Sequence, residues 1–400
     1  MKKRINLPVL VLSLLVLSSC QKDDGLTQED TLGATANGSD PTDPIPQEIW
    51  PYSSYNYEFP DLPAHFQTAQ VRGFDNTPAN NPITNEGATL GRVLFYEKAM
   101  SQNQTISCAS CHQQEVAFGD PAPLSDGFTG GQTGRHSMGL VNSTYYERGR
   151  FFWDERAATL EEQVLLPIQD PVEMGMDLET LVERLEGLDY YPPLFEAAFG
   201  SSEINSEKVS LALAQFIRSM VSSKSRYDEG LAMVGRIQAN FPNFNAMENL
   251  GKNLFVQHCG TCHQSALGPG DVRSDAIFHM AVPLNNGLDA VTTDRGFGAV
   301  TGNPADDGKF KSGSMRNIAV QPPYMHDGRF PTLRAVIDFY SEGVQNHPNL
   351  SPPLGGGGPN GGVRQINLTN QEKEALEAFL NTMTDNEFLS DPKFSDPFKQ

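Results

Sequence analysis

The chain has 400 residues and a formal net charge of −20 at pH 7, with 49 acidic side chains against 29 basic ones. So acidic a chain repels nucleic acid and anionic lipid, which excludes nucleic-acid binding and favours a small basic protein as partner. The length allows two domains of ordinary size.

The amino terminus predicts export from the cytoplasm. Residues 2–4 are basic, and residues 7–17 form an apolar run that is too short for a transmembrane helix and ends shortly before Cys20. Residues 1–19 therefore read as a signal peptide and resemble the signal of bacterial lipoproteins, in which the cysteine is lipidated and begins the mature chain. The membrane is then contacted through the lipid anchor only. The alternative is that Cys20 simply happens to end an ordinary signal peptide.

The residues that follow predict a spacer and a location. Residues 20–60 are rich in Asp, Thr, Gly and Pro and lack apolar periodicity, which indicates a flexible spacer between anchor and folded body. The acidic stretch at residues 21–24 resembles that of lipoproteins displayed on the outer surface of some bacteria. We therefore expect a lipid-anchored protein of the cell envelope, periplasmic or on the outer-membrane surface.

The remaining sequence predicts helices and few strands. Thr159 and Glu162 have the spacing of a capping box that opens a short helix, and Pro167 is expected to stop it. Alternating strand patterns are few, so the fold class is expected to be mainly α. Further helices are predicted over residues 86–100, 177–187, 206–222, 332–340 and 370–383.

Two pentads of the form Cys-x-x-Cys-His, at residues 108–112 and 259–263, carry the clearest chemical signal. Two thiols at this spacing can each add to a vinyl group of one porphyrin, and the adjacent imidazole can bind its iron, which is the pattern of a c-type haem. A zinc site, a redox dithiol, a disulfide pair and chance are the alternatives. Zinc-binding pairs usually lie closer together, and neither pair has a βαβ context. The predicted haem-attachment residues are Cys108, Cys111, Cys259 and Cys262.

One pentad in each half of the chain predicts two haem domains. We place the first at residues 61–225 and the second at residues 226–390. Four of the five cysteines belong to the pentads and the fifth is Cys20, so every cysteine has an assigned role.

Several ordered blocks surround the pentads and give the chain a family resemblance. Residues 90–92 read Leu-Gly-Arg, 152–154 read Phe-Trp-Asp, 171–174 read Pro-Val-Glu-Met, and 323–328 read Pro-Tyr-Met-His-Asp-Gly. With the pentads, these blocks resemble the bacterial di-haem cytochrome c peroxidase family, including its MauG-like branch. The resemblance implies two cytochrome c-like helical domains with long loops, each with one covalently attached haem.

The resemblance also implies roles for single residues. His112 and His263 match the proximal iron ligands, Glu173 matches the acid–base group, Gln163 matches the distal amide, and Trp153 matches the tryptophan between the haems. Splitting peroxide requires a proton to move from one oxygen to the other, which a carboxylate in a poorly solvated pocket can do. The alternatives are a solvated Glu173, a surface Gln163 and a Trp153 that is only part of the core.

Three positions depart from the family pattern. One concerns the first haem, one a calcium site between the domains, and one the second haem. Family members that need reductive activation carry a histidine where this chain has Phe128, so the first haem is expected to be open without priming. His136 could replace it as a distal ligand, although a lone loop histidine is more often solvated. His136 also stands where the family has a calcium-binding asparagine, near carbonyls expected at Gln321 and Pro323. Imidazole is a poor calcium ligand, which disfavours calcium there.

The third departure concerns the distal ligand of the second haem. The peroxidases have a methionine fourteen residues after the histidine that corresponds to His326, whereas here that position is Tyr340, as in the MauG-like branch. Phenolate is a hard anionic donor that favours oxidised iron, whereas a thioether raises the reduction potential. The alternatives are that Tyr340 is only an aromatic residue of an amphipathic helix, with Met315 or Met325 as the ligand.

The sequence thus predicts a di-haem c-type cytochrome peroxidase. Hydrogen peroxide is reduced to water at the first haem, and electrons from a small redox protein, such as a cytochrome c or a cupredoxin, arrive through the second. One rival is a MauG-like di-haem oxidase that acts on a protein or organic substrate, and another is a non-catalytic di-haem electron carrier. A homodimer is a possible assembly.

Overall fold

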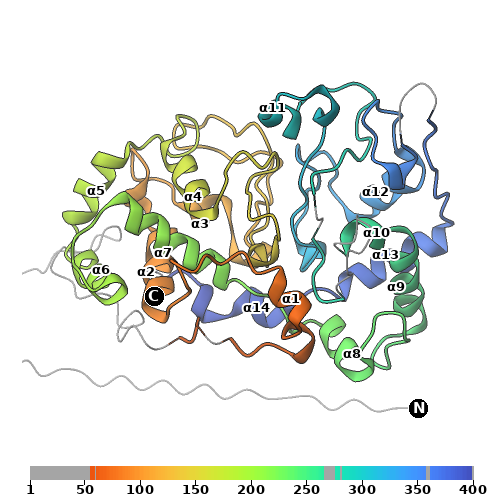
Figure 1. The fold of residues 1–400 in the computed structure, drawn as a ribbon, viewed down its shortest axis with the longest axis horizontal. Helices are drawn as coiled ribbons and strands as arrows, with labels where there is room; N and C mark the ends of the chain where they lie inside the picture. The colour runs from red at the N-terminus through yellow and green to blue at the C-terminus, as the bar shows by residue number, and fades with distance from the viewer. Residues whose placement is uncertain (1–54, 59, 265–274, 280–281, 357–360, 399–400) are drawn as a thin grey trace, which may run out of the picture. The chain divides into compact units, whose positions relative to one another are not determined.

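The computed structural model describes residues 55–58, 60–264, 275–279, 282–356 and 361–398, all within one compact unit, Pro41–Gln400 (Figure 1). The predicted signal peptide, Cys20 and most of the predicted spacer lie outside the described residues, so they stay predictions. Within the described part of the chain, no helix is both long and apolar enough to cross a membrane.

Helices supply the regular structure, and β-pairing among the described residues is limited to isolated bridges. The predicted mainly α fold with long loops is thereby confirmed. The helices are α1 Ala69–Gly73, α2 Asn85–Tyr96, α3 Cys108–Cys111, α4 Leu160–Gln169, α5 Leu178–Glu186, α6 Tyr191–Phe199, α7 Ser206–Ser219, α8 Arg226–Val234, α9 Ala246–His258, α10 Gly260–His263, α11 Phe297–Thr301, α12 Leu333–Asp338, α13 Asn370–Asn381 and α14 Asn386–Ser390.

Each half of the described chain is built on one tightly packed helix pair, α2 with α7 and α9 with α13. In the first pair, a Cβ added at Gly91 would lie 2.0 Å from the carbonyl oxygen of Ala212. In the second, a Cβ added at Gly251 would lie 1.8 Å from the carbonyl oxygen of Ala375. Both pairs therefore depend on a glycine that lets two backbones meet, and buried residues gather around them in two separate clusters. The predicted domain boundary between residues 225 and 226 stays a prediction.

Replacing Gly91 by Ala is expected to destabilise the protein by roughly 1–3 kcal/mol, because the added methyl forces α2 away from α7. The measurement is urea unfolding of the haem-loaded protein. Gly73→Ala is the control, since a Cβ at Gly73 would meet nothing within 4 Å. Equal stability of the two variants would contradict the close approach.

Two sequence predictions about α4 and its neighbours were wrong in detail. Pro167 does not stop α4, which continues to Gln169, because a proline removes one backbone hydrogen bond without ending a helix that packs well on one face. The predicted capping box is only half formed. The Thr159 hydroxyl accepts from the Glu162 N–H, but the Glu162 carboxylate accepts from the N–H of Ala158 instead of Thr159.

The other predicted helices are present with shorter ends. The helix predicted over residues 86–100 ends at Tyr96 and is followed by a separate 3-10 turn, Lys98–Met100. The helix predicted over residues 332–340 ends at Asp338 and passes into a π-helical turn, Phe339–Gly343. Such turns often occur at functional sites.

The carboxy-terminal segment returns to the first helix pair. Phe388 and Phe394 belong to the same buried cluster as α2 and α7. The Tyr96 hydroxyl donates to the Phe394 carbonyl at 2.7 Å, and Arg92 Nε donates to the Ser395 carbonyl at 2.6 Å. Residues after α13 therefore stabilise the half of the molecule that contains the first pentad.

Candidate functional site

The two pentads open into two cavities. The first, of about 600 Å³, is lined by Cys108, Cys111 and His112. The second, of about 240 Å³, is lined by the cysteines and histidine of the second pentad. Both cavities share part of one wall, which includes Trp153 and Lys311. Each predicted haem-attachment pair therefore faces a space of its own, and the two spaces adjoin.

The first pentad forms the short helix α3, whose first turn is closed when the Ser110 hydroxyl accepts a hydrogen bond from the Ser107 N–H at 3.0 Å. Both thiols are free, and burial raises the pKa of Cys108 to about 12 and that of Cys111 to about 11. With these raised pKa values both thiols are protonated at neutral pH. No group of three His, Cys, Asp or Glu residues within the described ranges is arranged as a metal site.

His112 is oriented by a backbone carbonyl. Its Nδ1 lies 2.9 Å from the carbonyl oxygen of Phe118 and donates to it, and the Met138 backbone is a second hydrogen-bond partner of the ring. Burial lowers the pKa of His112, so the imidazole is neutral at pH 7. A neutral imidazole with its second nitrogen held by a carbonyl is the usual state of an iron-binding histidine.

Glu173 and Gln163 reach the first cavity from two neighbouring segments. Gln163 lies on α4, and Glu173 lies on the loop that follows α4. The Glu173 N–H donates to the Asp170 carboxylate at 3.2 Å, and the Glu173 carbonyl accepts from the Phe128 N–H at 3.0 Å. Burial raises the pKa of Glu173, Asp170 raises it further, and Arg156 opposes the shift. A raised pKa brings the acid and base forms closer in free energy at neutral pH, as proton transfer requires.

Arg156 lines the first cavity, although no role was predicted for it from the sequence. It lines the first cavity with Phe152, and its guanidinium carbon lies 3.5 Å from the centre of the Phe152 ring. Its Nη1 lies 3.2 Å from the Asp154 carboxylate, so the cation is held in place. The available signal was its position two residues after the Phe-Trp-Asp block at residues 152–154.

Phe128 is held by contacts outside the first cavity. It is absent from the described residues that line the cavity wall. Its ring packs on Gly175, where an added Cβ would lie 2.5 Å from the ring, and Asn103 Nδ2 donates to its carbonyl at 2.6 Å. Gly175 has a φ of +64°, a conformation that favours glycine. The loop is thus fixed beside Glu173, and the prediction that the first haem is open without priming stays a prediction.

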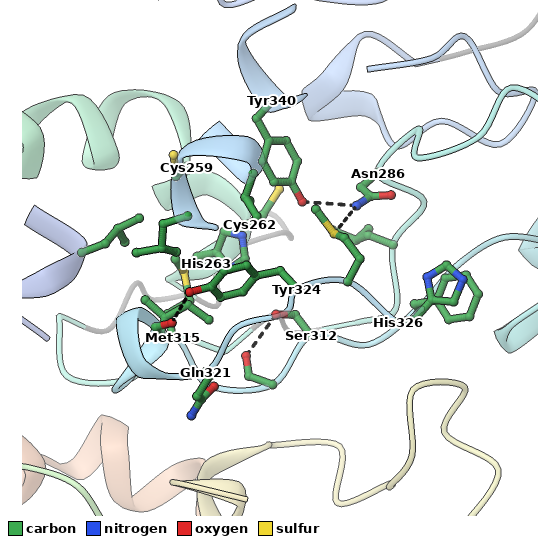
Figure 2. Close-up of a pocket in the computed structure, with 18 of the residues that line it drawn as sticks. Cys259, Cys262, His263, Asn286, Ser312, Met315, Gln321, Tyr324, His326 and Tyr340 are labelled. Carbon is green, nitrogen blue, oxygen red and sulfur yellow. Dashed lines mark hydrogen bonds between the residues drawn. The ribbon is translucent and has the colours of Figure 1, made fainter. Parts of the chain in front are cut away.

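The second pentad follows α9 and forms α10, with His263 at its end (Figure 2). Both cysteines are free, and burial raises the pKa of Cys259 to about 12 and that of Cys262 to about 11. His263 Nδ1 is buried and has no hydrogen-bond partner among the described residues. Burial lowers the pKa of His263 to about 4, so this imidazole is also neutral.

Tyr340 points into the second cavity from the π-helical turn (Figure 2). Asn286 Nδ2 donates to the Tyr340 hydroxyl at 3.3 Å and also contacts the Met325 sulfur at 3.5 Å. Burial raises the pKa of Tyr340 to about 12, and the Asn286 hydrogen bond opposes the shift. Met315 lines the same cavity. The structure therefore brings the predicted ligand and both of its rivals together, and Asn286 is a further polar residue that the sequence analysis missed.

Trp153 lies in the shared wall of the two cavities. Its indole N–H donates to the carbonyl of His136 at 2.7 Å, and its own carbonyl accepts from the Lys311 N–H at 2.7 Å. His326 is next to it, with ring centres 6.4 Å apart, and stacks on Phe310 at 3.8 Å. This position agrees with a role as a bridge between two cofactors.

His136 is buried and also lines both cavities. Its Nδ1 lies 3.1 Å from the Ala122 carbonyl and 3.2 Å from the Pro123 carbonyl, which fits an N–H donor. Gln321 and Pro323 line the second cavity. The position expected for an oxygen ligand of calcium thus holds a nitrogen donor that is already satisfied by carbonyls.

Both sites fit a covalently attached haem by their own chemistry. Each has two free, protonated thiols and one neutral imidazole at the edge of a largely apolar cavity, and neither thiol pair has formed a disulfide. Thiols in this state can add to the vinyl groups of a porphyrin, and the imidazole can bind its iron.

Comparison with known proteins agrees with this chemistry. The family model described as di-haem cytochrome c peroxidase matches residues 85–234. The methylamine utilization protein MauG of Methylorubrum extorquens is 32% identical over 309 residues, 76% of this chain and 80% of that protein. The cytochrome c551 peroxidase of Nitrosomonas europaea is 30% identical over 262 residues, 65% of this chain and 74% of that protein.

A solved structure is similar over most of its length. It is a MauG-like protein associated with microbial copper homeostasis, 34% identical, with a TM-score of 0.68 over 86% of this chain and 100% of that one. Two paired-cysteine cavities, the matched family model and these relatives lead to one conclusion. The chain belongs to the di-haem cytochrome c peroxidase and MauG family, whose members are oxidoreductases, and it carries two c-type haems.

Proposed function

We propose that the chain reduces hydrogen peroxide to water in the first cavity and draws the electrons through the second. The observation that carries this proposal is the presence of Glu173, Gln163 and Arg156 in the wall of the cavity that also contains His112. The haem attached at Cys108 and Cys111 would supply an iron that binds peroxide and takes up its oxidising power.

The residues of the first cavity supply the proton chemistry. Glu173 accepts the proton from one peroxide oxygen and returns it to the other, which then leaves as water. The Gln163 amide orients peroxide through hydrogen bonds, and the Arg156 guanidinium offsets negative charge on the leaving oxygen. In total, one peroxide, two protons and two electrons give two waters. Trp153, in the wall between the cavities, carries the electrons.

We infer that a protein or organic substrate gives up these electrons, as in the MauG-like branch. Tyr340 beside Asn286 supports this inference, because a hard anionic ligand makes the second haem a weak acceptor of electrons from cytochromes and a good store of oxidising power. Since the solved MauG-like relative is associated with copper homeostasis, a copper-handling envelope protein is the first substrate to test.

The second candidate is a cytochrome c peroxidase supplied by a small redox protein such as a cytochrome c or a cupredoxin. Met325 favours it, because its sulfur contacts the same Asn286 amide as Tyr340 and a thioether ligand would raise the potential of the second haem. The strongly acidic chain also suits a basic donor.

The test starts with the protein produced in a host that matures c-type cytochromes. Hydrogen peroxide is mixed with it in a stopped-flow spectrometer, without prior reduction, in the presence and absence of reduced cytochrome c. We expect rapid peroxide consumption without priming and slow oxidation of added cytochrome c. Fast, stoichiometric oxidation of cytochrome c would favour the peroxidase instead, and a preparation inert to peroxide would sink both candidates.

We also propose that the protein is a lipoprotein of the cell envelope, anchored through Cys20. In cells, Cys20→Ala is expected to abolish incorporation of labelled fatty acid and to move the protein out of the membrane fraction. Cys111→Ala is the matched control, because it removes a haem-attachment thiol and leaves the anchor. Continued lipidation of the Cys20→Ala protein would refute the anchor.

A further inference from the structure

Lys311 is a buried cation that the proposed reaction does not use. It is 5% exposed, and its Nζ donates to the carbonyl of Arg150 at 2.9 Å. The ammonium lies 3.8 Å from the centre of the Tyr146 ring and 4.5 Å from that of Phe151. Since Lys311 lines both cavities and its backbone is bonded to Trp153, this charge lies next to the expected electron path.

Tyr146 is not among the described residues that line either cavity, but its ring contacts Lys311, which lines both. It is buried, and its hydroxyl donates to the carboxylate of Glu155. This carboxylate is fully buried, and its Oε2 lies 2.8 Å from Nη2 of Arg148. A phenol bonded to a carboxylate is easily oxidised, because its proton can move to the carboxylate as the electron leaves. Tyr146 is therefore a site where oxidising equivalents could be lost.

The charges around Trp153 differ from those around Tyr146, whose ring faces the Lys311 ammonium. Among the described residues no cation lies over the ring of Trp153, and its indole N–H donates to the carbonyl of His136, which stabilises positive charge on the indole. A positive charge close to a ring opposes the removal of an electron from it, and the effect is strong in a poorly solvated site. The charges thus favour oxidation at Trp153 over Tyr146.

We propose that the Lys311 ammonium protects Tyr146 from oxidation and so keeps the oxidising equivalents of peroxide between the two cavities. Without this charge, Tyr146 loses one electron to the oxidised site and its phenolic proton moves to Glu155, which leaves a neutral tyrosyl radical beside a protonated carboxyl. This inference rests on the proposed function, because peroxide supplies the oxidising equivalents.

The charge on Lys311 depends on pH. Burial lowers its pKa to about 7, and Glu155 opposes the shift. The other groups that face the ammonium are the rings of Tyr146 and Phe151, the Arg150 carbonyl and His279, whose pKa Lys311 itself lowers. The protecting cation is therefore present below about pH 7 and is lost as the pH rises through that value.

The experiment is freeze-quench electron paramagnetic resonance of the haem-loaded protein, mixed with hydrogen peroxide at pH 6. Lys311→Met, which removes the charge and keeps an apolar chain of similar length, is expected to raise the tyrosyl radical yield by roughly tenfold or more. Lys311→Arg should stay at the wild-type level, and Lys311→Met with Tyr146→Phe should lose the signal. When the wild-type protein is moved from pH 6 to pH 8, the yield of the tyrosyl radical should rise, although by less than in Lys311→Met. This comparison needs no variant.

Lys252→Met is the matched control. Lys252 is also buried, its Nζ donates to the Ile237 carbonyl, and it lies 5.0 Å from the centre of the Phe241 ring, but it is in neither cavity wall. The Lys252→Met variant should be less stable than the wild type, but its yield of tyrosyl radical should not increase. The proposal is overturned if Lys311→Met consumes peroxide without a radical on Tyr146, or if the signal survives in the double variant. A wild-type protein that does not consume peroxide overturns the proposed function, and the inference with it.

Discussion

Glu173→Gln is expected to lower peroxide turnover by ~10²–10⁴-fold while both haems remain attached, because the amide cannot accept and return a proton. The change is nearly isosteric and leaves the backbone bonds of Glu173 to Asp170 and Phe128 in place. The rate of the first, stoichiometric reaction with peroxide in the stopped-flow spectrometer, which needs no added electron donor, measures the loss. The absorbance of the attached haems checks that the cofactors are retained. Glu183→Gln, on the exposed face of α5, is the matched control.

The pH dependence of peroxide turnover is a second test of the role of Glu173. Because burial raises the pKa of Glu173, its ionised form is lost at a higher pH than that of an ordinary glutamate, whose pKa is about 4.3. Wild-type turnover should therefore fall on the acid side as the pH drops through this raised value, and the fall should disappear in Glu173→Gln. An unchanged rate in the variant, or an acid limb that persists in it, would remove Glu173 from the proton path.

The sequence predicted the parts of the fold and site that depend on short spacing. The cysteine pairs, the helix around Gln163 and the Thr159 cap are local patterns, and the structure contains each of them, although the predicted capping box is only half formed. Helix ends were less predictable. Pro167 did not stop α4, because tertiary packing outweighed the loss of one hydrogen bond.

The sequence could not predict contacts made across long distances in the chain. Lys311 is one of two lysines that flank Phe310 in a loop, and what distinguishes it is its hydrogen bond to the Arg150 carbonyl, 161 residues earlier. Asn286 becomes a site residue because its amide donates to the hydroxyl of Tyr340, 54 residues later. Phe394 packs in the same buried cluster as helices α2 and α7, which lie far earlier in the sequence. No periodicity or motif encodes such pairs, because folding alone brings them together.

Tyr340→Phe is expected to change the resting electron paramagnetic resonance spectrum of the second haem, because it removes the only atom of that side chain that can bind iron. The reduction potential of the second haem should rise by on the order of 0.1 V, within the roughly 0.8 V range that axial ligands cover. Tyr324→Phe is the matched control. Tyr324 lines the same cavity, but its hydroxyl donates to the Ile318 carbonyl at 2.9 Å and should not affect the spectrum.

Two further variants connect the ligand to the function. Tyr340→Met should shift the enzyme towards faster oxidation of reduced cytochrome c and away from oxidation of other substrates, because a thioether favours reduced iron. Met325→Leu tests the rival ligand, whose sulfur lies 3.5 Å from the same Asn286 amide. If Met325→Leu alters the resting spectrum and Tyr340→Phe does not, the MauG-like assignment fails and the small-donor peroxidase takes its place. These two variants therefore test together which side chain binds the second iron and which molecule supplies the electrons.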